Sequence, residues 1–186
     1  MPTIGVVGVG LIGRAWANVF ARAGWDVRLW DPDAAALRNA PALIEASLRD
    51  VARHGLATDP AAAARRLTVA ASLDDAVKGA EFVQESGPER IEIKQELFAR
   101  LDAAAAPEAI LATSSSFIIT SRFAAELKGR HRCLVAHPVN SPHVVPIVEL
   151  SGAEFSRPKP SRGRGRSSRP SARCRSSSSA RSTASS

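Results

Sequence analysis

Three glycines and one aspartate form the pattern with the most chemical content in this chain. Gly8, Gly10 and Gly13 follow the apolar run 4–7, and Asp31 closes the next apolar run, 18 positions after the third glycine. Glycines at this spacing permit a tight turn, let the backbone approach a pyrophosphate and let a helix pack closely on a strand. The acidic side chain can accept hydrogen bonds from a ribose diol. The pattern therefore predicts a dinucleotide-binding site.

The residues around this pattern also indicate which dinucleotide binds. The phosphates are expected at the start of the helix predicted over residues 11–23, where the N–H groups near Leu11 and Ile12 have no intrahelical partner. The negative charge of Asp31 would repel a 2′-phosphate, and neither Pro32 nor Asp33 supplies a cation to offset it. The sequence therefore favours NAD over NADP as the cofactor.

A histidine and a glutamate late in the chain could supply a general base. An enzyme that oxidises an alcohol needs a group that accepts the hydroxyl proton, and histidine titrates near neutral pH. His137 follows the apolar run 133–136, and the returning run 145–150 can bring Glu149 beside it to hold the imidazole tautomer. His143 is the alternative base; we prefer His137 because it stands at a strand end.

The elements that must position these residues alternate along the chain. Strands are expected at 3–7, 27–30, 67–71, 81–84, 109–112, 133–136 and 145–150. Helices are expected at 11–23, about 33–54, about 59–65, 89–103 and 121–128. This alternation predicts an α/β fold with a Rossmann-type, doubly wound and mainly parallel sheet.

Polar residues follow four of the expected strands. They are Asp31, the segment 84–86 with Glu89, the segment 113–116, and His137. Any one of them alone would more often be a helix cap or a core residue. Parallel strands end at one edge of a sheet, where ligands of doubly wound folds bind, so we expect the four groups to meet there.

Charge divides the chain into a body and a tail. The formal net charge is +7, but residues 1–150 carry about −1 and residues 151–186 about +8. The tail holds 13 serines in 36 residues and has almost nothing apolar to bury, so we expect it to be disordered. We therefore predict a dinucleotide-binding domain at 1–150 and an Arg/Ser-rich tail at 151–186. The tail could bind RNA or carry phosphates, but a solvated tail without a role is favoured.

The two cysteines, Cys133 and Cys174, match no metal or disulfide spacing, so we expect no metal site. Cys133 lies in an apolar run and is expected in the core. The sequence shows no charged leader before an apolar stretch and no apolar run long enough to cross a bilayer. These features predict a soluble protein in the reducing cytoplasm.

Four segments carry a resemblance to a known family. They read VVGVGLIGRAWANVFARAGWDVRLWD, QESGPERIEIKQELFARLD, ILATSSSFIITS and VAHPVNSPHVVPIVEL. Over residues 3–150 the chain resembles the NAD-binding domain of the 3-hydroxyacyl-CoA dehydrogenase family, and most of all the branch that contains L-gulonate 3-dehydrogenase, or lambda-crystallin. The last segment is the most specific, because it joins a histidine and a glutamate at the family's spacing of twelve.

The resemblance implies roles for individual residues. Ser116 would bind the substrate oxygen, His137 would be the general base, and Glu149 would orient it. Cofactor contacts are implied at three further positions: Glu89, Lys94 and Ser114. Phe117 stands where the family has a small residue and could crowd the substrate.

Family members continue into a helical domain that closes the substrate cleft and forms the dimer. No helical apolar pattern follows Leu150 here, so we expect a truncated chain, an out-of-frame tail and a lost dimer interface. The favoured function is NAD-dependent oxidation of a 3-hydroxy group in an acyl-CoA, a hydroxy acid or a sugar acid. The alternative is an inactive NAD-binding fragment whose basic tail binds a partner or RNA.

Overall fold

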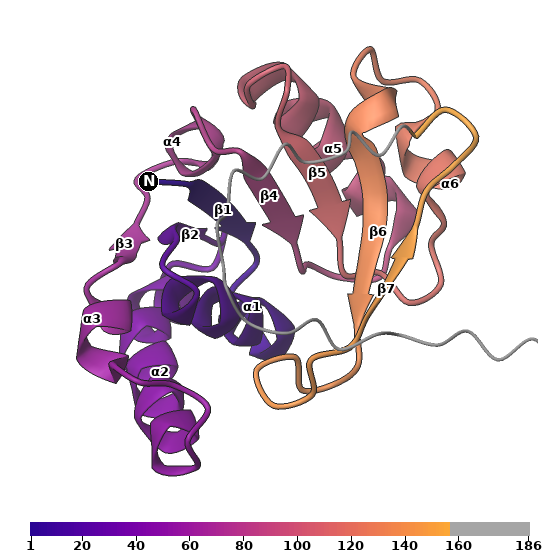
Figure 1. Ribbon diagram of the computed structural model, residues 1–186. Coiled ribbons are helices and arrows are strands. Elements are labelled where there is room, and N and C mark those ends of the chain that lie inside the picture. Colours follow the sequence, from indigo (N-terminus) through magenta and orange to yellow (C-terminus); the bar gives the residue numbers. More distant parts are fainter. Residues whose placement is uncertain (157–186) are drawn as a thin grey trace, which may run out of the picture.

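A computed structural model describes residues 1–156 of the chain (Figure 1). Its strands are β1 (Thr3–Val7), β2 (Asp26–Trp30), β3 (Leu67–Val69), β4 (Phe82–Glu85), β5 (Ile110–Thr113), β6 (Cys133–Pro138) and β7 (Val148–Ser151). Its helices are α1 (Leu11–Arg22), α2 (Ala34–Arg53), α3 (Pro60–Ala64), α4 (Leu73–Val77), α5 (Ile91–Ala104) and α6 (Thr120–Ala124), with a 3-10 turn, η1 (Arg130–Arg132).

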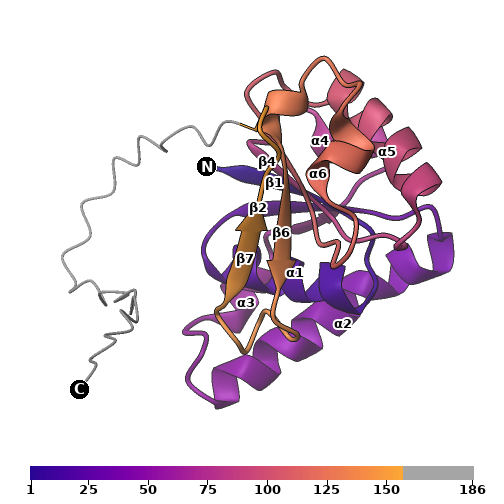
Figure 2. The same ribbon diagram turned by 90° about the vertical axis from the view of Figure 1, so that its right-hand side faces the viewer.

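The seven strands form one sheet in the order β3-β2-β1-β4-β5-β6-β7. The first six pair in parallel, and β7 pairs antiparallel with β6 at the edge (Figure 2). The strand order reverses direction between β1 and β4, which is where doubly wound folds open a crevice for ligands. The structure confirms the predicted Rossmann-type sheet.

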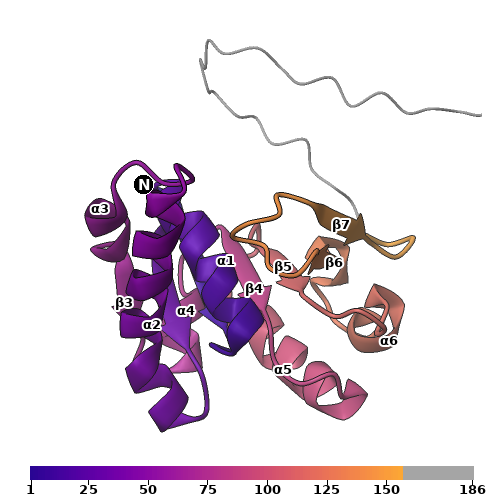
Figure 3. The ribbon, with the colours of Figure 1, turned by 90° about the horizontal axis from the view of Figure 1, so that it is seen from below.

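Helices cover both faces of the sheet and bury two apolar clusters (Figure 3). Alternate residues of β1 point to opposite faces, so Val6 packs under α1 and α2 while Val7 packs towards α4 and α5. Phe98 of α5 is fully buried and its ring centroid lies 4.3 Å from that of Phe123. The buried strands β1 and β4 therefore hold their carboxyl ends in fixed positions.

Most element boundaries agree with the sequence predictions to within three residues, and the notable differences concern α4, α6 and β6. Helix α4 was not predicted: it has only five residues, too few for a periodic pattern, and Ser72 caps it by accepting a hydrogen bond from Asp75 N at 3.1 Å. The helix expected at 121–128 spans only Thr120–Ala124. Strand β6 extends beyond the expected run and includes His137, which has consequences for the site.

The described fold continues past residue 150, where we placed the start of the tail. Strand β7 ends at Ser151, and Ser156 Oγ donates to the carbonyl of Cys133 at 2.7 Å. Phe155 packs on the core, with the Arg130 guanidinium 5.2 Å from its ring centroid. Six residues of the predicted tail thus belong to the folded body, and the predictions for 157–186 lie outside the described residues.

Cys133 lies in the core as predicted, and burial raises the pKa of its thiol to about 12, with Asp102 adding to the shift. Cys174 lies outside the described residues. Within residues 1–156, no group of three or more His, Cys, Asp or Glu side chains could hold a metal ion. No helix in the same part of the chain is both long and apolar enough to cross a membrane.

Candidate active site

The glycine-rich turn connects β1 to α1 at the centre of the sheet. Gly8 has a φ of +91°, a backbone conformation that favours glycine, and its N–H donates to the carbonyl of Trp30 at 2.8 Å. Helix α1 begins after Gly10 without a side-chain cap. The N–H groups of Leu11 and Ile12 therefore face the strand end without an intrahelical partner, beside the positive end of the helix dipole.

The three glycines of the turn have different reasons to lack a side chain. A Cβ on Gly13 would lie 1.8 Å from the carbonyl oxygen of Gly8, and a Cβ on Gly8 would lie 2.9 Å from the carbonyl of Ser86. Packing within the chain explains both. A Cβ on Gly10 would meet nothing within 4 Å, and Gly10 has an ordinary φ of −62°. No packing within the chain requires glycine at position 10, although glycine suits the N-cap of α1, and the missing side chain leaves the start of the helix open to a pyrophosphate.

Asp31 follows β2 beside the same turn. Its Oδ2 accepts a hydrogen bond from Val9 N at 2.7 Å, and its Oδ1 accepts one from Asp33 N at 2.9 Å. The carboxylate thus ties the glycine-rich turn to the end of β2. Each oxygen keeps a further lone pair with which it can accept from a ribose hydroxyl.

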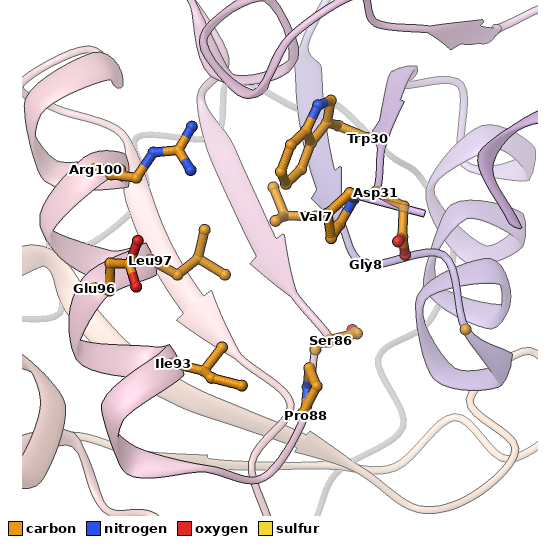
Figure 4. Close-up of a pocket in the computed structure, with 13 residues that line it drawn as sticks. Val7, Gly8, Trp30, Asp31, Ser86, Pro88, Ile93, Glu96, Leu97 and Arg100 are labelled. Atoms are coloured by element: carbon orange, nitrogen blue, oxygen red, sulfur yellow. The ribbon is translucent and has the colours of Figure 1, made fainter. Parts of the chain in front are cut away.

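A cleft of about 490 Å³ opens between this turn and helix α5 (Figure 4). Trp30, Ile93 and Leu97 give it mainly apolar walls, and Asp31 supplies a polar group at the rim. Trp30 and Arg100 lie towards one end of the cleft, and Ser86 lies towards the other (Figure 4). An apolar slot with few polar groups suits a flat aromatic ring such as adenine, with the phosphates at the turn.

A second group of residues forms a hydrogen-bonded relay at the β6–β7 edge. His137 and Glu149 are register partners in the antiparallel pair, and His137 Nδ1 lies 3.3 Å from Glu149 Oε2. On the other side of the ring, His137 Nε2 lies 3.0 Å from Ser116 Oγ. The side chain of His137 is 35% exposed and that of Glu149 is 78% exposed, so a substrate can reach the relay from solvent.

Glu89 holds the serine segment that carries Ser116. Its carboxylate accepts from Ser115 Oγ at 2.8 Å and from Ser116 N at 2.5 Å. Ser115 Oγ also accepts from Ile118 N at 2.8 Å, which closes the turn after β5. Glu89 therefore links the loop before α5 to the relay. A second, smaller cleft of about 150 Å³ lies there, between Ser116, Phe117 and Glu149.

Lys94 lies apart from both clefts. It is 1% exposed, and its Nζ donates to Glu85 Oε2 at 2.7 Å and to Thr113 Oγ1 at 3.2 Å. Thr113 Oγ1 in turn donates to Glu85 Oε2 at 2.5 Å, and Gly87 N donates to Glu85 Oε1 at 2.5 Å. This buried network joins α5 to the ends of β4 and β5, the strands that lead to both clefts.

Ser114 is surrounded by polar groups of the chain itself. Its Oγ lies 3.1 Å from Trp16 Nε1, 2.8 Å from Gln84 Nε2 and 2.9 Å from Ser86 Oγ. Sequence reasoning placed residue 86 in a polar group after a strand but assigned it no role, and Trp16 was not singled out. The 98 positions between residues 16 and 114 explain why no local pattern could show this contact.

His143, the alternative base, lies in the loop between β6 and β7. Burial lowers the pKa of its imidazole, the charge of Arg22 lowers it further, and Asp50 partly opposes the shift. Its Nδ1 is buried without a hydrogen-bond partner in the described part of the chain. The charges that act on its imidazole come from Arg22 of α1 and Asp50 of α2.

The structure thus brings the predicted site residues into two adjoining groups. The first holds the glycine-rich turn and Asp31; the second holds Ser116, His137, Glu149 and Glu89. The arrangement defines a dinucleotide-binding Rossmann domain with a hydrogen-bonded Ser116–His137–Glu149 relay at its edge.

Comparison with known proteins places this domain in a family. Residues 3–160 match the model of the 3-hydroxyacyl-CoA dehydrogenase NAD-binding domain. The chain belongs to the 3-hydroxyacyl-CoA dehydrogenase family, and its cofactor is NAD.

Relatives and solved structures agree with this assignment. L-carnitine dehydrogenase of Streptomyces coelicolor is 40% identical over 151 residues, which is 81% of this chain and 47% of the relative. The lambda-crystallin homolog of Bos taurus is 41% identical over 150 residues, 79% of this chain and 47% of the relative. The chain therefore spans about half the length of these relatives.

Among solved structures, 3-hydroxybutyryl-CoA dehydrogenase from Escherichia coli superposes with a TM-score of 0.75 at 33% identity, covering 80% of this chain and 32% of that one. The (S)-3-hydroxybutyryl-CoA dehydrogenase from Ralstonia eutropha gives a TM-score of 0.77 at 28% identity, covering 84% and 56%. These likenesses support the fold and the dehydrogenase family.

Proposed function

We propose that this chain binds NAD and supplies the base and the oxyanion contact for oxidation of a 3-hydroxy acid or its CoA ester. The observation that carries the proposal is the Ser116–His137–Glu149 relay beside the dinucleotide cleft. The names of the relatives, which include an L-carnitine dehydrogenase and 3-hydroxybutyryl-CoA dehydrogenases, support a 3-hydroxy substrate. NAD supplies the hydride acceptor when it is bound.

His137 removes the hydroxyl proton. Its Nε2 lies beside Ser116 Oγ, so a substrate hydroxyl that approaches both atoms from the solvent side can give its proton to Nε2 and accept a hydrogen bond from the serine. Glu149 accepts from Nδ1–H, which fixes the tautomer with Nε2 unprotonated and stabilises the imidazolium that forms. The hydroxyl loses one proton to His137; with the hydride of the same carbon accepted by bound NAD, a ketone would result.

Cofactor binding is assigned to the other group of residues. The backbone N–H groups of Leu11 and Ile12 would hold the pyrophosphate, and Asp31 would accept from the adenosine ribose. Glu89 would hold the Ser116 segment at the reacting end. Lys94 would support the site through the buried network with Glu85.

The test is the rate of NADH formation, followed by its absorbance, in His137→Gln, Glu149→Gln and His143→Gln variants. It is run with the chain alone and with the chain fused to the C-terminal half of a relative. We expect His137→Gln to lose about 10²–10⁴-fold in rate, the usual contribution of a general base, and Glu149→Gln to lose less. NAD binding should survive in both. An active His137→Gln variant beside an inactive His143→Gln variant would refute the assignment.

A second proposal is an NAD-binding module without turnover. The exposure of the relay favours it, since Phe117 is 87% exposed and Glu149 is 78% exposed, and catalysis needs a site that excludes water. The same experiment separates the two. NAD binding without NADH formation from hydroxy acids or CoA esters supports the module.

A further inference from the structure

The hydroxyl of Ser114 has three hydrogen-bonding neighbours, and their chemistry fixes which group donates in each hydrogen bond. A serine hydroxyl can accept two hydrogen bonds and donate one. The indole Nε1 of Trp16 and the amide Nε2 of Gln84 can only donate, and both lie within 3.1 Å of Ser114 Oγ. These two donors occupy both lone pairs.

Only one arrangement is then left for the contact between the two serines. Because Ser114 can accept no third hydrogen bond, it must donate to Ser86 Oγ across the 2.9 Å that separates them. Ser86 is thus the acceptor of that bond, and its own hydroxyl hydrogen is not used in it.

The orientation of the Gln84 side-chain amide agrees with the conclusion that Ser114 donates to Ser86. With Nε2 towards Ser114, the amide leaves Oε1 as the buried atom that lacks a partner within the described residues. The reverse orientation would leave the NH₂ group without a partner instead, and an orphaned buried donor is rarer in proteins than an under-satisfied carbonyl.

The free hydrogen of Ser86 lies where the cofactor must pass. Ser86 lines the dinucleotide cleft (Figure 4). Its carbonyl lies 2.9 Å from where a Cβ on Gly8 would stand, and its Cβ lies 3.5 Å from where a Cβ on Gly13 would stand. Within residues 1–156, Ser86 Oγ has no hydrogen-bond partner except Ser114. The donor therefore sits beside the pyrophosphate turn, towards the end of the cleft away from Trp30.

We propose that Ser86 donates a hydrogen bond to an oxygen of bound NAD beyond its adenosine half, at the pyrophosphate or the second ribose, and that Ser114 is a positioning residue that holds this donor in place. The resemblance to the family implied a cofactor contact for Ser114 itself; here Ser114 acts through Ser86. The inference rests on NAD as the cofactor and not on turnover, so it can fail while the proposed oxidation stands.

The experiment measures the affinity of the whole chain for AMP, ADP, ADP-ribose and NAD by calorimetric titration. Ser86→Ala should bind ADP-ribose and NAD about tenfold more weakly, a loss typical of one hydrogen bond, and should bind AMP within about twofold of the parent. Weaker ADP binding identifies the pyrophosphate as the acceptor; unchanged ADP binding identifies the second ribose. Ser121→Ala, at an exposed position on α6, is the matched control and should change nothing.

A double-mutant cycle tests the role of Ser114. Ser114→Ala should weaken NAD binding by about threefold, less than Ser86→Ala, and should add almost nothing in a variant that already carries Ser86→Ala. It should also lower the melting temperature more than Ser86→Ala does, because the buried donors of Trp16 and Gln84 lose their acceptor.

Three results would overturn the inference. The first is parental NAD affinity in Ser86→Ala. The second is an equal loss for AMP and NAD, which would mean that the variant damages the cleft as a whole. The third is a larger loss in Ser114→Ala than in Ser86→Ala with additive effects, which would return the direct cofactor contact to Ser114.

Discussion

Replacing Gly10 with alanine should separate cofactor binding from folding. The new Cβ would meet no atom of the chain within 4 Å, and the backbone angles, φ −62° and ψ −169°, are allowed for alanine. The folded state therefore gains no clash, but Gly10 is the N-cap of α1, a position that prefers glycine to alanine. The unfolded state loses conformational freedom, which offsets that cost, so the free energy of unfolding should change by less than about 1 kcal/mol.

The effect on NAD binding should be larger than the effect on folding. The methyl group would occupy the space through which the pyrophosphate approaches the start of α1, and forcing a methyl group into a packed interface costs about 1–3 kcal/mol. Such a cost corresponds to about a 5- to 160-fold loss of affinity. Calorimetric titration with NAD and thermal melting without NAD measure the two effects separately.

Gly13→Ala is the matched control on the same helix. Its Cβ would stand 1.8 Å from the carbonyl oxygen of Gly8, and a backbone atom cannot move aside as a side chain can. We expect a loss of about 3 kcal/mol or more in the free energy of unfolding, at the upper end of the cost of overpacking. A Gly10→Ala variant that melts several degrees below the parent, or that binds NAD as tightly as the parent, would refute the reasoning.

Three further predictions concern the rest of the body. Lys94→Met should lower the free energy of unfolding by about 3–5 kcal/mol in urea titrations, because it leaves the buried carboxylate of Glu85 unpaired, and adding Glu85→Gln should restore much of the loss. The lowered pKa of His143 means that the unfolded chain binds the proton more tightly, so stability should fall as the pH drops below about 6.5, and His143→Gln should reduce that dependence in melting curves. Deleting residues 157–186 should leave the melting temperature unchanged, whereas a deletion that also removes Ser156 should lower it, because its hydroxyl donates to β6.

The fold could be predicted because its pattern is local. Apolar runs of four or five residues alternate with amphipathic stretches, and each run became a strand of the sheet. One helix had no such local pattern and could not be predicted. Helix α4 has five residues and depends on the Ser72 cap and on burial against β1 for its existence, and no periodicity in so short a segment could show it.

The contact between His137 and Glu149 could be predicted for a different reason. The prolines around residue 140 required a turn, and a returning strand that pairs with β6 must place one residue opposite His137. In the structure that residue is Glu149.

The networks behind the clefts could not be predicted in this way. Lys94 meets Thr113, and Trp16 meets Ser114, only because β4 and β5 pair in one register beneath two helices. A shift of that register by one residue would turn the Thr113 and Ser114 hydroxyls each to the other face of the sheet, away from its present partner. The sequence contains the residue types, but their partners depend on the packing of the whole sheet.

The two parts of the site therefore depend on the fold to different degrees. The glycine-rich turn and Asp31 are fixed by the pairing of β1 with β2, two interior strands of the sheet, and by the hydrogen bonds from Gly8 N to the Trp30 carbonyl and from Val9 N to Asp31 Oδ2. His137 and Glu149 depend on β7, an edge strand whose four residues are all exposed. Cofactor binding should consequently withstand mild destabilisation that separates β7 from β6. In urea below the main unfolding transition, NAD affinity should persist while any NADH formation is lost, and simultaneous loss of both would show that the edge strand is as firmly held as the centre.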